Sequence, residues 1–220
     1  MRSELKELLK SESARYSVRL DAKAMAQFER YMDLLQEYSQ KLNLTGIESE
    51  EGIVIKHFVD SLSAHQFLKN NWFVADFGSG IGCPGIPLKI VKPGLKLILL
   101  ESNQKKCAFI NLVVRNLKLT DARAIAHRAE DRAFQKSLAG SLNAVLARAL
   151  GKLDLILKLS APYLKMGGRV IAYKSAQIED ELKQAEKILA QLGFRQERIF
   201  EYALPSDAGL RKLVILKKTN

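Results

Sequence analysis

The feature that most constrains the fold is a series of short, continuous apolar runs that begins near residue 72. The runs are WFVAD at 72–76, LKLILLE at 95–101, ARAIAH at 122–127, LNAVLAR at 142–148 and GRVIAYK at 168–174. They are rich in Val, Ile and Leu and do not alternate with polar residues, which is typical of strands covered on both faces. The intervals between runs are long enough for helices. The sequence therefore predicts an α/β fold with a parallel, doubly wound sheet.

Helical spacing dominates the first 70 residues and recurs between the apolar runs. The first stripe consists of Met25, Phe28, Met32, Leu35 and Leu42, in a helix that begins after Asp21 as N-cap and ends at turn formers in 43–46. Similar spacing predicts helices at about 55–68, 105–117 and 178–192, the last one ended by Gly193. Segments 195–204 and 210–218 predict an antiparallel hairpin. We accordingly divide the chain into an N-terminal helical cap, 1–70, and an α/β domain, 71–220.

The charge distribution narrows the choice of partners. The net charge is +11, but residues 1–73 carry 10 basic and 11 acidic side chains, whereas residues 74–220 carry 25 and 13. A basic field on one part of a protein favours a polyanion such as nucleic acid, although a merely solvated basic surface is the alternative. Two cysteines, no secretory signal and no run of 18 apolar residues predict a cytoplasmic protein without a membrane segment.

A glycine-rich segment, DFGSGIGCPGIPL at 76–88, follows the first predicted strand. Glycines let the backbone turn sharply and let a ligand approach the main chain closely. Gly80, Gly82 and Gly85 satisfy the dinucleotide pattern G-x-G-x-x-G, and Glu101 ends the next predicted strand 21 residues after Gly80, where a ribose-binding acid would lie. Taken alone, the segment is compatible with NAD.

Other features favour S-adenosylmethionine over NAD. Asp76 precedes Gly78 and Gly80 in a D-x-G-x-G pattern, by which adenosylmethionine enzymes present a loop to the amino-acid end of the cofactor. That cofactor has no pyrophosphate, so it does not need the anion site of dinucleotides. The C-terminal hairpin is the usual ending of the methyltransferase sheet. The chain leaves no room for a separate substrate domain and contains neither a Tyr-x-x-x-Lys pair nor a P-loop.

Several short motifs then occur together in one order along the chain. They are NLT at 43–45, HFVDSL at 57–62, DFGSGIGCPGIPLKI at 76–90, LES at 100–102, KK at 105–106, RAE at 128–130 and ARA at 147–149. With them the chain resembles the small-subunit ribosomal RNA guanine-N7 methyltransferases, the RsmG or GidB family, over nearly its whole length. The part G-x-G-x-P-G-I-P-L is specific, because generic methyltransferases seldom have both prolines.

This resemblance implies a Rossmann-like, S-adenosylmethionine-binding methyltransferase domain at 71–220 and a set of cofactor-binding residues. The set is Asp76, Gly78, Gly80, Cys83, Glu101, Ser102, Ala129, Glu130 and Arg148. Glu101 and Ser102 would meet the ribose, Ala129 and Glu130 would border the adenine, and Arg148 would lie at the cofactor and substrate edge. The chain departs from the family pattern in having Cys83, Ala147 and Ser175 where a larger apolar residue, Ser and Gly are common.

The resemblance also implies the reaction, which is methylation of guanine N7 at the family's position 527 of 16S ribosomal RNA. The partner would be that RNA or the assembling small subunit, and we expect a monomer. N7 carries a lone pair and no proton, so we predict no general base, and three scattered histidines with two cysteines suggest no metal site. The alternatives are methylation of another RNA or a ribosomal protein, and a non-catalytic RNA-binding protein of the same fold.

Overall fold

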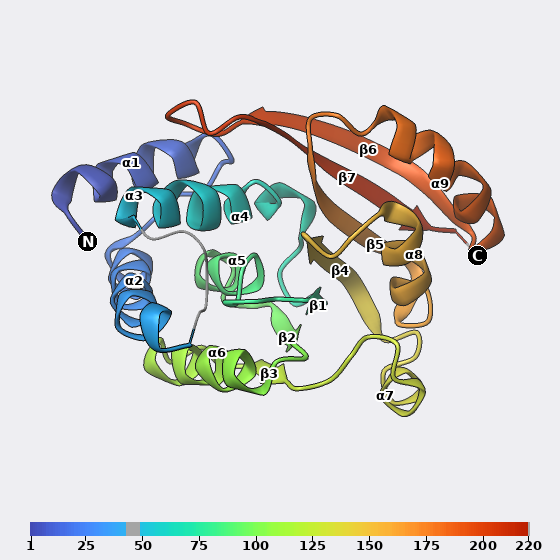
Figure 1. The fold of residues 1–220 in the computed structure, drawn as a ribbon, viewed down its shortest axis with the longest axis horizontal. Coiled ribbons are helices and arrows are strands. Elements are labelled where there is room, and N and C mark those ends of the chain that lie inside the picture. Colours follow the sequence, from blue (N-terminus) through green and yellow to red (C-terminus); the bar gives the residue numbers. More distant parts are fainter. Residues whose placement is uncertain (43–48, 220) are drawn as a thin grey trace.

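The computed structural model describes residues 1–42 and 49–219, which form a seven-stranded sheet with helices on both faces (Figure 1). The strands are β1 (Phe73–Phe77), β2 (Lys96–Leu100), β3 (Ala122–Ile125), β4 (Leu142–Arg148), β5 (Leu164–Ser175), β6 (Phe194–Ala203) and β7 (Leu210–Lys218). Their order across the sheet is β3-β2-β1-β4-β5-β7-β6. The pairs from β3 to β5 are parallel, whereas β7 is antiparallel to β5 and β6. The predicted sheet and hairpin are confirmed.

The helices lie both before the sheet and between its strands. Before it come α1 (Ser3–Ala14), α2 (Ala22–Leu42), α3 (Glu50–Ile53), the π-helical η1 (Val54–Val59), α4 (Asp60–Leu62) and the 3-10 turn η2 (His65–Phe67). Between strands come α5 (Gly85–Val91), α6 (Gln104–Asn116), α7 (Arg132–Ser137), α8 (Leu153–Ser160) and α9 (Glu179–Gln191). Within the described ranges, every helix is too short or too polar to cross a bilayer.

The helices α2 and α6 are among those that begin at side-chain caps. Asp21 accepts a hydrogen bond from the Ala24 N–H at 2.7 Å, as predicted for the start of α2. Asn103 accepts hydrogen bonds from the N–H groups of Lys105 and Lys106 at 2.9 and 3.1 Å. Because the first N–H groups of a helix have no partner inside the helix, these side chains fix where α2 and α6 begin.

The central strands of the sheet are buried on both faces. Along β1 and β2, Val74 and Leu97 pack into one core with α2, α5 and α6, whereas Phe77 and Ile98 pack into a second core with α8 and α9. Successive strand residues point to opposite faces, so neighbouring apolar residues serve different cores. This is why the apolar runs of the sequence are continuous.

The N-terminal helices belong to the first of these two cores. Leu9 of α1, Phe28 of α2 and Phe58 of η1 are fully buried in the same cluster as Val74 of the sheet. Figure 1 shows these helices along one side of the sheet, near α5 and α6. The division of the chain near residue 70 stays a prediction, and the motif at 43–45 lies outside the described residues.

The helix expected at 55–68 is different in the structure. The chain is helical from Glu50 to Leu62, but with a π-helical turn at 54–59, and Leu68 is already extended. The Ser61 hydroxyl donates to the His57 carbonyl, and the Ser63 hydroxyl donates to the Asp60 carbonyl. Such side-chain bonds to carbonyls three or four residues earlier compete with the backbone ladder and bend helices. The apolar spacing alone did not reveal this interruption.

Candidate functional site

The segment 78–84 connects β1 to α5 at the carboxyl edge of the parallel strands. Gly78, Gly80 and Gly82 have φ values of +67°, +60° and +101°, a region that residues with a side chain rarely adopt. The N–H groups of Gly78 and Ser79 both donate to the Leu100 carbonyl, at 2.9 and 3.1 Å. The glycines therefore fold the loop back onto the end of β2.

Glu101 follows β2 and fixes this loop with its side chain. Its two carboxylate oxygens accept hydrogen bonds from the N–H groups of Gly80, at 2.8 Å, and Asn103, at 2.9 Å. The residue is 8% exposed. Each carboxylate oxygen has a second lone pair, so the group can still accept hydrogen bonds from a ligand. Glu101 thus connects the loop after β1 to the end of β2.

A pocket of about 250 Å³ opens beside Gly78. Its lining consists of Phe77, Gly78, Leu100, Ser102, His127, Arg128, Ala129, Glu130, Leu150 and Leu159. Four of the predicted cofactor residues, Gly78, Ser102, Ala129 and Glu130, are in this set. The Ala129 carbonyl accepts hydrogen bonds from the Tyr163 hydroxyl at 2.7 Å and from Gln135 at 2.9 Å, which holds the wall after β3 in place. The pocket lining thus combines apolar side chains with polar and charged residues.

Asp76 and Cys83 are buried on the inner side of the glycine loop. One oxygen of Asp76, Oδ2, accepts a hydrogen bond from the Gly85 N–H at 2.8 Å, while Oδ1 has no partner among the described residues. Burial raises the pKa of Asp76 to about 7. Burial also raises the pKa of Cys83, whose sulfur lies 3.6 Å from the Tyr31 hydroxyl. Cys83 is consequently a buried, neutral thiol beside a tyrosine hydroxyl.

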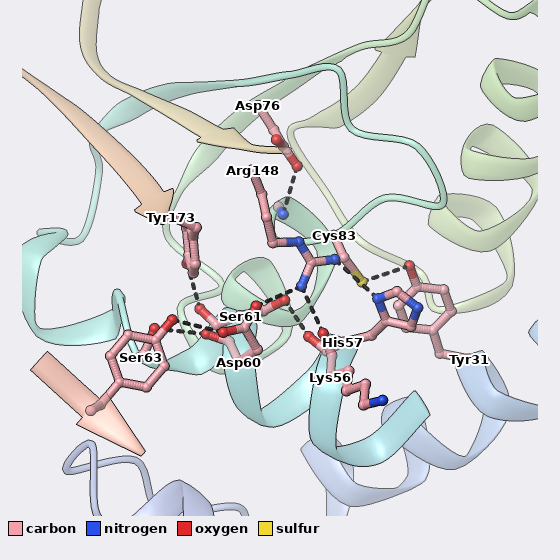
Figure 2. A network of polar contacts seen from close by, with 12 residues as sticks. Tyr31, Lys56, His57, Asp60, Ser61, Ser63, Asp76, Cys83, Arg148 and Tyr173 are labelled. Atoms are coloured by element: carbon pink, nitrogen blue, oxygen red, sulfur yellow. Dashed lines mark hydrogen bonds and ion pairs between the residues drawn. The ribbon is translucent and has the colours of Figure 1, made fainter. Parts of the chain in front are cut away.

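Arg148, the last residue of β4, lies at the centre of a polar network between the sheet and the helices before it (Figure 2). Its Nη1 donates to Asp60 Oδ2 at 2.9 Å and to the Lys56 carbonyl at 3.0 Å. Its Nη2 lies 3.1 Å from His57 Nδ1. The Asp60 carboxylate also accepts a hydrogen bond from the Tyr202 hydroxyl at 2.7 Å. Segments far apart in the sequence thus meet at one guanidinium group.

The imidazole of His57 is neutral at physiological pH. Burial, followed by the charges of Arg148 and Lys56, lowers the pKa of His57 to about 3. Because a guanidinium group only donates, Nδ1 of His57 accepts the hydrogen bond and the ring proton is on Nε2. His57 therefore orients Arg148 and does not carry a positive charge next to it. Within residues 1–42 and 49–219, no three His, Cys, Asp or Glu side chains gather as a metal-binding group.

The structure thus places the predicted residues in two adjoining groups. Gly78, Gly80, Glu101, Ser102, Ala129 and Glu130 lie at the pocket or at the loop beside it, while Asp76, Cys83 and Arg148 lie toward the helices before the sheet. Their binding roles stay predictions. Sequence reasoning missed Asp60, Tyr31 and Tyr202. The motif HFVDSL contains Asp60, but nothing in the sequence pairs it with Arg148, which lies 88 residues further along the chain.

Comparison with known proteins identifies the family. The model of the GidB family, described as rRNA small subunit methyltransferase G, matches residues 24–207. The chain belongs to the rRNA small subunit methyltransferase G family. It is 38% identical over 211 residues to the protein of that name from Carboxydothermus hydrogenoformans, covering 96% of this chain and 90% of the relative. It is also 38% identical over 201 residues to that of Geobacillus kaustophilus, covering 90% and 84%.

Solved structures share the fold of this family member at much lower identity. The TYW2 protein of M. jannaschii, solved in complex with AdoMet, has a TM-score of 0.61 and 17% identity, covering 78% of this chain and 77% of that one. Fibrillarin of Aeropyrum pernix, solved with natively bound S-adenosyl-L-methionine, has a TM-score of 0.54 and 13% identity, covering 67% of each chain. These similarities confirm the methyltransferase fold.

The region that matches the rRNA small subunit methyltransferase G family includes both groups of site residues. It extends over the π-helical segment η1, the glycine loop and the end of β4. The matched region contains most of α2 and all of α3, η1, α4 and η2, and the residues that hold Arg148 lie in η1 and α4.

Proposed function

We propose that this member of the rRNA small subunit methyltransferase G family transfers the methyl group of S-adenosylmethionine to N7 of a guanine in 16S ribosomal RNA. The target would be position 527, as the family resemblance implies, and the protein would act in the cytoplasm as a monomer. The observation that carries the proposal is the meeting of the glycine loop, Glu101 and the pocket at the carboxyl edge of β1. β1 is where the strand order reverses, and open α/β sheets bind ligands at such a point.

The residues present fit S-adenosylmethionine. Phe77, Leu100 and Leu150 offer apolar walls to an adenine ring, and Glu101 offers carboxylate oxygens to ribose hydroxyls. Gly78 is exposed in the pocket at a φ of +67°, which favours glycine, and a Cβ added there would lie 2.9 Å from Leu150 Cδ1, in the space open to a ligand. Oδ1 of Asp76 is buried and has no hydrogen-bond partner among the described residues, so it is available to a hydrogen-bond donor of a ligand. When bound, the cofactor supplies an electrophilic methyl group on a sulfonium sulfur.

The protein's part in the reaction is positioning. Guanine N7 attacks with an in-plane lone pair and loses no proton, so no side chain has to act as a base. The site must hold nucleophile, methyl carbon and sulfur in line and exclude water. His57 is unsuited as a base because its Nδ1 lone pair is directed to Arg148. Arg148, fixed at the end of β4 next to the loop, can orient a ligand acceptor.

Replacing Glu101 tests the assignment of the ribose subsite. Glu101→Ala should weaken S-adenosylmethionine binding by about 1–3 kcal/mol, because ribose hydroxyls lose a charged acceptor and the loop loses its bond at Gly80. Isothermal titration calorimetry measures the affinity. Glu197→Ala is the control, since Glu197 is also an ion-paired acid, but its partner is Arg169 in β5, away from the loop. Unchanged affinity in Glu101→Ala would place the ribose elsewhere.

The basic part of the chain supports an RNA partner and predicts where salt will act. Lys105 and Lys106, at the start of α6, form no ion pair with any described residue, whereas Lys6 pairs with Glu29 and Lys10 pairs with Glu7. The affinity for 16S RNA should fall steeply with salt. In a plot of log K against log salt concentration, the slope should be about −0.7 to −0.9 for each phosphate contact. Replacing both Lys105 and Lys106 by Ala should reduce this slope by about 1–2.

The matched control for this prediction is the double replacement of Lys6 and Lys10 by Ala, which should leave the salt slope unchanged. Filter binding or fluorescence anisotropy at several salt concentrations gives both slopes. S-adenosylmethionine affinity should stay the same in both double variants. If the salt slope changed only when Lys6 and Lys10 were replaced, the RNA-binding surface would not lie on the α/β part of the chain.

A further inference from the structure

Asp60 is a buried carboxylate with two partners from distant parts of the chain. Its side chain is 7% exposed. Oδ2 accepts a hydrogen bond from Arg148 at the end of β4, and Oδ1 accepts one from Tyr202 in β6. A carboxylate in such a site is retained only when it is paired and hydrogen-bonded. Both oxygens are satisfied here, so the position of Asp60 is fixed by the sheet and by the C-terminal hairpin together.

Arg148 is correspondingly fixed from one side only. Asp60, the Lys56 carbonyl and His57 Nδ1 all belong to η1 and the first residue of α4, and together they use three N–H bonds of the guanidinium group. A guanidinium group has five N–H bonds. The N–H of Nε and one N–H of Nη2 have no partner among the described residues. Three acceptors on one side over-determine the orientation of the group and leave two donors for a ligand.

The strand register places the backbone of Arg148 beside the glycine loop. Ala147 of β4 is the neighbour of Phe77 of β1, so the next residues, Arg148 and Gly78, leave adjacent strands at the same edge of the sheet. A guanidinium group is planar and suits a carboxylate, which it binds with two parallel N–H donors. The charged groups of S-adenosylmethionine at that end are its amino-acid ammonium and carboxylate.

We propose that Asp60 is a positioning residue that aims Arg148 at the carboxylate of the cofactor's amino-acid end, with Tyr202 holding Asp60 in place. The proposal rests on the proposed function for the identity of the cofactor. It assigns to the segment before the sheet a part in cofactor binding, although Asp60 does not touch the cofactor. It also connects the C-terminal hairpin to the site through a single hydroxyl group.

Two ligands that differ at the amino-acid end can distinguish a role of Asp60 in positioning Arg148 from a role in stabilising the fold. S-adenosylhomocysteine has the amino-acid carboxylate, whereas 5′-methylthioadenosine keeps the adenosine and lacks the amino-acid group. Calorimetry gives Kd for both ligands. Asp60→Asn should raise the Kd of S-adenosylhomocysteine about 10-fold, as expected when a hydrogen bond to a charged group is misaligned. The Kd of 5′-methylthioadenosine should change less than about 2-fold. A change that merely loosened the fold would weaken both ligands equally.

Two tyrosines provide a matched pair that keeps the buried charges intact. Tyr202→Phe removes the hydroxyl that holds Asp60, and Tyr173→Phe removes a hydroxyl that donates to the neighbouring Ser61 carbonyl at 2.7 Å. Tyr202→Phe should raise the Kd of S-adenosylhomocysteine a few-fold more than that of 5′-methylthioadenosine. Tyr173→Phe should leave the ratio of the two Kd values unchanged. This pair also gives the answer if Asp60→Asn does not fold.

The outcome with Arg148→Gln completes the test. When Asp60→Asn is added to that variant, the affinity for S-adenosylhomocysteine should not fall further relative to that for 5′-methylthioadenosine, because Asp60 acts through Arg148. Equal losses for both ligands, or no loss in Asp60→Asn and Tyr202→Phe, would overturn the positioning role. If the wild-type protein bound neither ligand, the proposed function itself would fail, which is a different result.

Discussion

Gly78→Arg should abolish S-adenosylmethionine binding, lowering the affinity by more than about 100-fold, which corresponds to more than about 2.8 kcal/mol. Gly78 has a φ of +67° and its backbone lines the pocket, where an Arg side chain would fill the space next to Leu150. The sheet should stay folded, because the new side chain points into the pocket and not into either core. Calorimetry measures the affinity, and circular dichroism verifies the fold.

Gly140→Arg is the matched control for this substitution. Gly140 has a φ of +61°, almost the same left-handed backbone, but a Cβ there would meet nothing within 4 Å. The control therefore carries the same backbone strain and the same added charge without filling the pocket. It should bind S-adenosylmethionine like the wild-type protein. Equal losses in the two variants would mean that backbone strain, and not occupation of the pocket, explains the effect.

Arg148→Met should destabilise the folded protein by about 3–5 kcal/mol, the usual cost of removing one partner of a buried ion pair. The side chains of Arg148 and Asp60 are 16% and 7% exposed, and Met would leave the Asp60 carboxylate without its cation. Urea unfolding followed by circular dichroism gives the free energy of unfolding. The loss is large because a charge stays buried, not because the pair itself stabilises the fold by that amount.

A double variant tests this explanation. Arg148→Met combined with Asp60→Asn removes both charges, so the free energy of unfolding should recover part of the loss seen in Arg148→Met alone. Lys158→Met is a control for removing an exposed cation, since the Lys158–Asp154 pair on α8 is 57% and 46% exposed and should change stability by less than about 1 kcal/mol. A loss of similar size in Arg148→Met and Lys158→Met would show that the Asp60 site is effectively solvated.

Much of the fold was predictable from local patterns. The five apolar runs correspond to β1 to β5, and the sequence 195–218 forms the predicted hairpin. The runs of the central strands are predictable because a strand buried on both faces must be apolar at nearly every position. The glycine loop after β1 and the place of Glu101 after β2 were predictable from the sequence, whereas the hydrogen bond from the Gly80 N–H to the Glu101 carboxylate was not.

The network around Arg148 was not predictable from the sequence alone. It depends on the π-helical turn at Val54–Val59, which places Lys56, His57 and Asp60 against one guanidinium group, and apolar spacing does not distinguish a π turn from an α-helix. Tyr202 reaches Asp60 across 142 residues. Contacts of this kind arise from tertiary packing between segments with no shared local pattern.

We expect the chain to methylate guanine N7 in 16S ribosomal RNA. The most direct measurement incubates the protein with labelled S-adenosylmethionine and small subunits, or their RNA, from cells that lack it. Borohydride and aniline then cleave the RNA at N7-methylated guanines, and reverse transcription maps the breaks. We predict one new break, at position 527, that is absent without the protein and with Gly78→Arg. Label that enters a ribosomal protein, another RNA or an RNA position that aniline does not cleave would contradict the account, as would no transfer at all.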